Sequence, residues 1–291
     1  MNKYFSKNIV FVCWFLMLLN AVIAAQSVNG PVNKTKEQSN LLNQITDEEN
    51  SLENIRKYYE MILEIDSTNY DALTNLGVIY QQKNNLEKSL SYFEKAVKFH
   101  PKRARAYHNL GILNSIIGNI DEAVVNLNKA AELDVNNPNS IRQLGIIYLQ
   151  NEMLNEAIES FSIALNRDKL DTESYLGEAI AYWSLKDYDK VIAAINEMQS
   201  LGLRFNRMEL LLADVYFKKN EYDKAMKYAK IDEAVNSYLP EGHYLLGVLY
   251  KMKDEKDKAE FEFKEAYTIA RENSNSSLEF SIETFFQKRK E

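Results

Sequence analysis

The pattern of apolar and polar residues between positions 70 and 273 repeats every 34 residues. The tripeptide Asn-Leu-Gly at 75–77 returns at 109–111, and Gln-Leu-Gly follows at 143–145. Continuing this spacing divides the segment, without any insertion, into six units that begin at Tyr70, Ala104, Pro138, Thr172, Asn206 and Pro240. Self-similarity at a fixed period of this length indicates a stack of small supersecondary units, each resting on the next.

Residue size follows the same spacing. The eighth residue is small in all six units, and the eleventh is Tyr in five of them. Small residues let two helices approach closely, so each unit is expected to be a pair of antiparallel helices. Short polar segments such as 83–85 and 118–121 would form the turns between them. The low content of glycine and proline, 9 and 4 in 291 residues, argues against a β-rich fold.

Equivalent positions of the six units are here called columns. A helix–turn–helix unit of 34 residues with small residues and tyrosine in these columns resembles the tetratricopeptide repeat family. The resemblance implies an all-α fold, a right-handed α-solenoid of helical hairpins, with the six repeats at 70–273. The periodic residues Ile55, Tyr59 and Ile62 predict a half repeat at 51–69, ahead of the first full unit. Residues 274–291 are expected to form a capping helix with Leu278, Ile282, Phe285 and Phe286 on its apolar face.

The fourth and fifth units depart from the columns. Glu178 and Met198 in the fourth unit, and Glu209 and Asp232 in the fifth, occupy places where an apolar or small residue is usual. Gly202 adds a possible helix end between the two units. This junction is therefore expected to be the least regular part of the stack.

The first 25 residues predict export from the cytosol. Lys3 and Lys7 precede an apolar stretch, 9–19, and small residues follow at Ala24 and Ala25. These features are typical of a signal peptide, although 9–25 is also nearly long enough for an uncleaved membrane anchor. Residues 26–50 are polar and are expected to be a flexible spacer. The expected location is periplasmic or secreted, or held at the membrane by residues 9–25.

No pattern for catalysis, metal or cofactor binding emerges. His100, His108 and His243 lack the spacing of a metal site, and neither a phosphate-binding loop nor a nucleophile elbow is present. Because almost every residue is assigned to repeats, the protein is expected not to be an enzyme. The formal charge of −7 argues against nucleic acid as a partner. The basic cluster Lys102, Arg103 and Arg105 is interpreted as a solvated helix start.

In the family that the chain resembles, first helices line a concave groove that binds peptides. The sixth residues of the first three units are Asn75, Asn109 and Gln143, flanked by His108 and Arg142, which are expected to add contacts to acidic groups of a partner. This amide row resembles the asparagine ladder of the O-linked N-acetylglucosamine transferase superhelix, which implies contacts with a peptide backbone. An amide both donates and accepts, so it suits a peptide group. A ladder of hydrogen bonds between neighbouring repeats is an equally weighted alternative.

The groove positions of the later units are apolar. The residues expected there to contact a partner are Leu176, Ile180, Trp183, Leu211, Phe217, Tyr244 and Leu245. A large apolar patch commonly marks a binding surface, although tight stacking of the repeats would bury the same residues. The resulting function hypothesis is a non-enzymatic scaffold that binds an extended segment or a helix of a protein partner. The alternative is a membrane-anchored accessory subunit of an envelope assembly for secretion, pili or polysaccharide.

Overall fold

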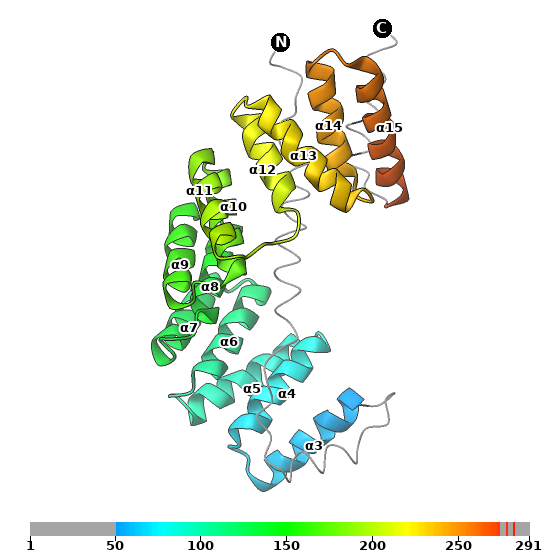
Figure 1. The fold of residues 1–291 in the computed structure, drawn as a ribbon. Helices are drawn as coiled ribbons and strands as arrows, with labels where there is room; N and C mark the ends of the chain where they lie inside the picture. The colour runs from blue at the N-terminus through cyan, green and yellow to red at the C-terminus, as the bar shows by residue number, and fades with distance from the viewer. Residues whose placement is uncertain (1–50, 274–277, 279–281, 283–291) are drawn as a thin grey trace. The chain divides into compact units, whose positions relative to one another are not determined.

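The computed structural model describes residues 51–273 together with Leu278 and Ile282, and all regular structure in this part is α-helical (Figure 1). The predicted all-α class is confirmed. The predictions for residues 1–50, and for Phe285 and Phe286 in the terminal segment, lie outside the described residues. Within the described ranges, no helix combines the length and the apolar character needed to cross a bilayer.

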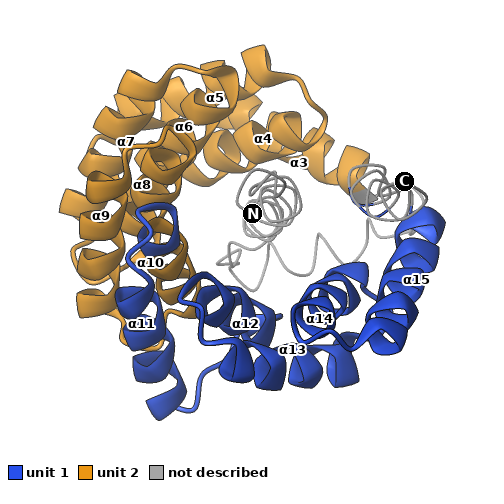
Figure 2. Ribbon diagram, turned by 90° about the horizontal axis from the view of Figure 1, so that it is seen from above, with its two compact units in different colours: residues 1–26, 182–291 blue, residues 27–181 orange. Residues whose placement is uncertain are grey.

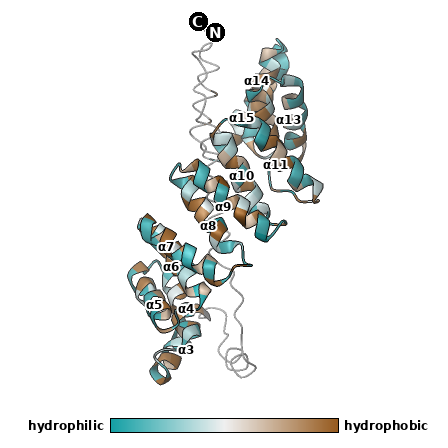
Figure 3. Ribbon diagram, turned by 90° about the vertical axis from the view of Figure 1, so that its left-hand side faces the viewer, coloured by the Kyte–Doolittle hydropathy of each residue, from teal (hydrophilic) through white to brown (hydrophobic). Residues whose placement is uncertain are grey.

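The helices follow one another in pairs joined by short turns. They are α3 (Ser51–Ile65), α4 (Tyr70–Gln82), α5 (Leu86–Phe99), α6 (Ala104–Ile117), α7 (Ile120–Leu133), α8 (Asn139–Gln150), α9 (Leu154–Arg167), α10 (Thr172–Ser184), α11 (Tyr188–Ser200), α12 (Met208–Lys218), α13 (Tyr222–Asn236), α14 (Pro240–Met252) and α15 (Lys256–Glu272). Each helix presents both polar and apolar residues around its circumference (Figure 3). Most helices therefore bury one face and expose another, whereas α12 has no exposed residue and α14 exposes only Lys251 and Met252 at its end.

Contacts divide the chain into two compact units (Figure 2). The described residues up to Ala181 form one of them, here called the N-terminal unit, and those from Tyr182 onward belong to the other, the C-terminal unit. In the N-terminal unit α4 packs on α5, α6 on α7 and α8 on α9. In the C-terminal unit α12 packs on α13 and α14 on α15.

The regular spacing of small residues reflects contact between glycine and a buried ring. A Cβ atom placed on Gly77 would lie 2.4 Å from Phe93, and one on Gly247 would lie 2.9 Å from Phe263. Both phenylalanines are almost completely buried. An alanine at either glycine would overlap with its ring, so the repeat requires glycine wherever the second helix supplies a phenylalanine at this place.

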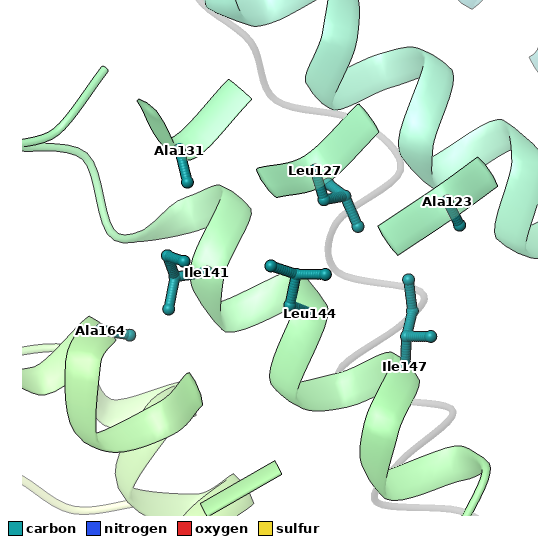
Figure 4. Close-up of a cluster of buried hydrophobic side chains, with 7 residues drawn as sticks. All are labelled: Ala123, Leu127, Ala131, Ile141, Leu144, Ile147 and Ala164. Carbon is teal, nitrogen blue, oxygen red and sulfur yellow. The ribbon is translucent and has the colours of Figure 1, made fainter. Parts of the chain in front are cut away.

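Successive pairs are joined by apolar clusters of the kind shown in Figure 4. There, Ala123, Leu127 and Ala131 of α7 face Ile141, Leu144 and Ile147 of α8, with Ala164 of α9 alongside. Tyr148 packs against the edge of this cluster and is only partly buried. The ring of Tyr148 therefore lies at the rim of the packed layer.

Lysines lie over the tyrosine column in four repeats. The lysine eight residues after the tyrosine stands 5.0–5.4 Å from the ring centre in the pairs Lys88–Tyr80, Lys190–Tyr182, Lys224–Tyr216 and Lys258–Tyr250. A cation above an aromatic face is attracted by the quadrupole of the ring. The long lysine side chain also covers the tyrosine ring and shields it from water.

A second recurring pair joins one repeat to the next. Lys83 lies 2.6 Å from Glu53, Lys253 lies 2.7 Å from Asp223, and Lys219 pairs with Asp189. In each case the lysine directly follows a first helix, and the acid lies 30 residues earlier, in the helix that precedes that first helix. These partly exposed pairs each add little stability. Their common spacing nevertheless favours one stacking register.

The segment 201–207 is the longest connection between helices in the C-terminal unit, as the departures from the columns predicted. Gly202 ends α11 in the left-handed region at φ 75°, and Leu203 N donates to Met198 O over 3.1 Å. Arg207 also has a positive φ, 64°, and precedes α12. The fifth pair therefore begins at Met208, two residues later than the regular spacing places it.

Candidate functional site

One face of α6 carries a buried polar group that lacks a hydrogen-bond partner among the described residues. Arg105, His108 and Asn109 share this face because they are three and four residues apart. The Nδ2 atom of Asn109 is buried and has no hydrogen-bond acceptor among the described residues. A buried amide donor without an acceptor is costly, by about 1–3 kcal/mol. Asn109 is thus the member of the amide row that has a hydrogen bond to offer.

His108, beside it, is held neutral. Its Nδ1 atom lies 2.9 Å from Ser140 Oγ of α8. Burial lowers the pKa of His108 to about 4, and the nearby guanidinium groups of Arg142 and Arg105 contribute to the shift. At neutral pH this side chain is therefore an uncharged hydrogen-bonding group. The expected contact of His108 with an acidic group through positive charge is not available.

Asn75 and Gln143, the other two members of the amide row, differ from Asn109. The Asn75 Nδ2 atom donates to Asp71 O over 2.7 Å, and its Oδ1 atom accepts a long bond of 3.4 Å from Arg105 Nη2. Asn75 therefore forms the kind of hydrogen bond between neighbouring repeats that the alternative interpretation of the amide row expects. Gln143 is buried, with 7% of its surface exposed. The three amides therefore occupy equivalent places in unequal surroundings.

Arg142 is committed to carboxylates of the protein itself. Its Nη1 atom lies 2.8 Å from Asp171 Oδ1, and its Nε atom lies 2.9 Å from Glu173 Oε2. Its Nη2 atom donates to Asn139 Oδ1 over 3.0 Å. The sequence pattern suggested contacts of Arg142 with acidic groups of a partner. In the structure the acidic groups come from the start of the next repeat, and Arg142 links α8 to that repeat.

The apolar groove positions are largely covered. Leu176, Ile180, Leu211 and Leu245 are each 2–6% exposed, which is the burial that tight stacking predicts. Trp183, Phe217 and Tyr244 are partly exposed and remain candidates for contact with a partner. Trp183 is oriented by a hydrogen bond of 2.7 Å from its Nε1 atom to Asp214 Oδ2. The Tyr244 ring packs edge-on against Phe263, with 5.7 Å between ring centres.

Comparison with known proteins identifies the repeat. Family models described as tetratricopeptide repeat match residues 71–134, which form α4–α7, and residues 240–273, which form α14 and α15. The chain is a tetratricopeptide repeat protein. No curated protein sequence matches it. Repeats of this kind are typically scaffolds for binding other proteins, without catalytic activity of their own.

Solved tetratricopeptide structures share its fold at low sequence identity. A tetratricopeptide repeat protein from Parabacteroides merdae is 20% identical over 84% of this chain and 98% of its own, with a TM-score of 0.57. PilF of Pseudomonas aeruginosa is 19% identical over 75% and 97%, with a TM-score of 0.60. MamA from Desulfovibrio magneticus is 18% identical over 58% and 96%, with a TM-score of 0.53. The likeness extends to the solenoid fold.

Two charged groups of this repeat protein were not anticipated as parts of a site. Arg207 is 5% exposed and pairs with Asp232 at 3.0 Å and with Glu241 at 2.7 Å. Asp214 is 2% exposed, and burial raises its pKa to about 6, against a smaller opposing effect of Lys218 and Trp183. Asp232, an acidic residue at a usually apolar place, was the signal in the sequence for the ion pairs of Arg207. Its partner Arg207, 25 residues earlier, was not identifiable from the repeat spacing.

Histidines and acids do not gather into a metal site in the described ranges. His243 Nδ1 lies 2.8 Å from Glu262 Oε2, and its Nε2 atom lies 3.2 Å from Ser237 O. These bonds join α14 to α15 and to the turn before α14, so His243 has a packing role. The polar surface of α6 therefore carries the groups best placed to meet a partner.

Proposed function

We propose that this tetratricopeptide protein is a scaffold that holds an extended segment of a partner protein along the face formed by α4, α6 and α8. The observation that carries the proposal is the buried Asn109 Nδ2 atom, which lacks an acceptor. The Asn109 side chain as a whole is only partly buried, so a change of its rotamer would turn the Nδ2 atom toward a backbone carbonyl of a partner, which would supply that acceptor. The side chains of Arg105 and His108 flank it and add one charged and one neutral hydrogen-bonding group.

An extended peptide suits this surface better than a folded domain. The groups that offer hydrogen bonds lie on single side chains of successive first helices, and an extended chain presents its carbonyls at regular intervals to such a row. Asn75 is tied to Asp71 and Arg105, so it would contribute only after exchanging the long bond to Arg105. Asn109 is consequently the expected centre of binding, and Arg105 is a contributor that the sequence interpretation left aside.

The test is to capture the partner by photo-crosslinking from position 109 in the native host, identify it, and measure its affinity for purified variants. Asn109→Ala and Asn109→Asp both remove the donor and should weaken binding roughly 2- to 13-fold, the value of one hydrogen bond. Asn155→Ala, at an exposed position of α9, is the matched control. Equal affinity of all variants would refute binding at this face.

The partly exposed aromatic residues of the C-terminal unit are the competing surface. Leu211→Asp and Leu245→Asp are poor tests of it, because both leucines are buried and a charge there would unfold the repeat. Tyr244→Ala and Phe217→Ala are better tests, since these rings are only partly buried. Loss of binding in these two variants, with no effect at position 109, would place the partner on the C-terminal unit instead.

We further propose that the scaffold acts outside the cytosol. The support is the sequence of the first 25 residues, which combines Lys3 and Lys7 with the apolar stretch 9–19 and the small residues Ala24 and Ala25. Cell fractionation of the intact chain, and of a chain lacking residues 1–25, tests this. A mature amino terminus at residue 25 or 26 indicates cleavage, whereas an intact membrane-bound chain favours the anchored accessory subunit. Equal cytosolic recovery of both chains would refute export.

A further inference from the structure

The turn between α5 and α6 carries a cluster of exposed cations around an exposed aromatic ring. Lys95 and Lys98 lie in the last turns of α5, Phe99 ends that helix, and Lys102 and Arg103 follow in the turn. These five residues, here called the basic turn patch, are all exposed, and 44% of the Phe99 surface is accessible to solvent. Within the described residues, none of the four cations forms an ion pair with a carboxylate.

The local structure holds the patch in a fixed shape. Lys95, Lys98 and Phe99 share one face of α5, because they are three and four residues apart. The turn is closed by the bonds from His100 N to Ala96 O, 2.9 Å, and from Arg103 N to His100 O, 3.1 Å. These bonds keep Lys102 and Arg103 next to the end of α5.

An aromatic ring supports Arg103 of the patch. The Arg103 guanidinium carbon stands 5.1 Å from the centre of the Tyr70 ring, and that ring packs edge-on against His100. His100 Nε2 lies 2.6 Å from Thr68 O, which ties the turn to the one before α4. Cation–π contact orients Arg103 while its N–H groups stay available. The sequence interpretation of a solvated helix start accounts for the charge but not for this support.

The charge of the patch is opposite to that of the whole protein, which has a formal charge of −7. Charged groups on a surface of this kind steer and select partners of opposite sign. The nearest acids along the chain are Glu94, directly before the patch, and Asp121. Asp66 lies in the turn before α4, which His100 contacts through Thr68. Asp66 is itself bonded to Thr68 N and Oγ, which lowers its pKa.

We infer that the basic turn patch binds an acidic segment of a protein that carries at least one apolar side chain. Carboxylates of the segment would pair with Lys98, Lys102 and Arg103, and its apolar side chain would cover Phe99. A nucleic acid or an anionic bilayer would extend beyond this single turn onto an acidic molecule, where like charges repel it. The patch lies at a turn and not on the α6 face around Asn109, so it adds a second contact to the proposed scaffold.

The test uses the full chain and fluorescent 12-residue probes. In the acidic probe, Glu residues alternate with single Phe or Leu residues. The matched Gln probe has the same sequence with Gln in place of every Glu. We expect the acidic probe to bind at least fivefold more tightly than the Gln probe at low salt, with the difference falling as salt is raised. Equal binding of the two probes would overturn the proposal.

Variants locate the site. Replacing Lys98, Lys102 and Arg103 by Gln should weaken the acidic probe at least fivefold, and Phe99→Ser should weaken both probes. The control with the same change of charge carries Gln at three other exposed cations, namely Lys169, Lys264 and Arg271. Asn109→Ala should leave probe binding unchanged, which separates this site from the proposed groove. An equal loss in the control variant, or tighter binding of phosphatidylserine vesicles or single-stranded RNA than of the acidic probe, would refute the proposal.

Discussion

The Lys88 ammonium group stands 5.0 Å from the centre of the Tyr80 ring, and the same pairing recurs in three later repeats. The third repeat breaks the series, because Glu156 occupies the lysine place below Tyr148. Burial raises the pKa of Tyr148, and the carboxylates of Glu156 and Glu159 raise it further. The tyrosine column is therefore stabilised by cations in some repeats and faces negative charge in another.

Replacing Lys88 by Met should lower the free energy of unfolding by about 0.5–1 kcal/mol, the usual value of an exposed cation–π pair. Methionine keeps most of the apolar stem, so the loss reports the charge. Urea unfolding followed by circular dichroism measures the change. Lys57→Met, at an exposed position of α3, is the control and should have no effect. Equal losses in both variants would mean that the Lys88–Tyr80 contact adds nothing specific.

Gly177→Ala should destabilise the protein by about 1–3 kcal/mol through overpacking. A Cβ atom on Gly177 would lie 2.3 Å from Cζ of the buried Phe161 ring, which also contacts Gly145. In a double-mutant cycle with Phe161→Leu, the smaller side chain should recover at least about 0.5 kcal/mol of the loss. Strict additivity in thermal unfolding would show that the Phe161 ring is not the obstacle.

Asp214 predicts a specific pH dependence of stability. Its folded pKa of about 6 lies above the unfolded value of about 3.9, so the folded state binds the proton more tightly. Protonation therefore stabilises the fold as pH falls from about 7 to 4, by about 2–3 kcal/mol for this group. Asp214→Asn should be more stable than the parent at pH 7, and the advantage should vanish near pH 4.

The measurement is the urea midpoint of the parent and of Asp214→Asn across that pH range. The difference between the two proteins cancels the titration of other groups, such as His108, whose lowered pKa acts in the opposite direction. Fluorescence of Trp183, which donates to Asp214, gives a local signal once Trp14 is replaced by Phe. A difference that stays constant with pH would contradict the burial of an ionisable Asp214.

Arg207→Met should destabilise the C-terminal unit by about 3–5 kcal/mol, because it leaves Asp232 and Glu241 buried without their cation. Replacing all three residues by apolar ones, as Met, Leu and Met, should cost much less, since no charge then remains buried. Calorimetry of the single and the triple variant compares their stabilities and so distinguishes the cost of uncompensated charge from the cost of altered packing. A triple variant as unstable as the single one would show that side-chain packing, and not uncompensated charge, controls this place.

The repeat spacing predicted much of the architecture because it depends on residue size. Gly77, Gly145 and Gly247 each face a phenylalanine of the second helix, a relation set by volume alone. The amide row was harder to interpret, because its hydrogen bonds depend on rotamers and on neighbours in other repeats. Asn75 and Asn109 share a column, yet only Asn75 has Arg105 across from it.

Burial at the groove positions also could not be obtained from the spacing. Leu211 and Trp183 were both expected to face the groove, but Leu211 is 2% exposed whereas Trp183 is partly exposed. The difference arises from how closely successive hairpins stack, which a single repeat does not encode. Arg142 is a similar case, since its acidic partner Asp171 belongs to the connection that precedes the next hairpin.

The ion pairs that join Lys83 to Glu53 and Lys253 to Asp223 each span 30 residues of chain. The side-chain hydrogen bond from Arg207 to Glu241 spans 34 residues. Interactions of such short reach give a low contact order, so the described helices that they join find their partners in neighbouring segments of the chain. Each hairpin can dock as soon as the preceding one exists, and the chain can fold in step with its own synthesis, from the amino terminus onward.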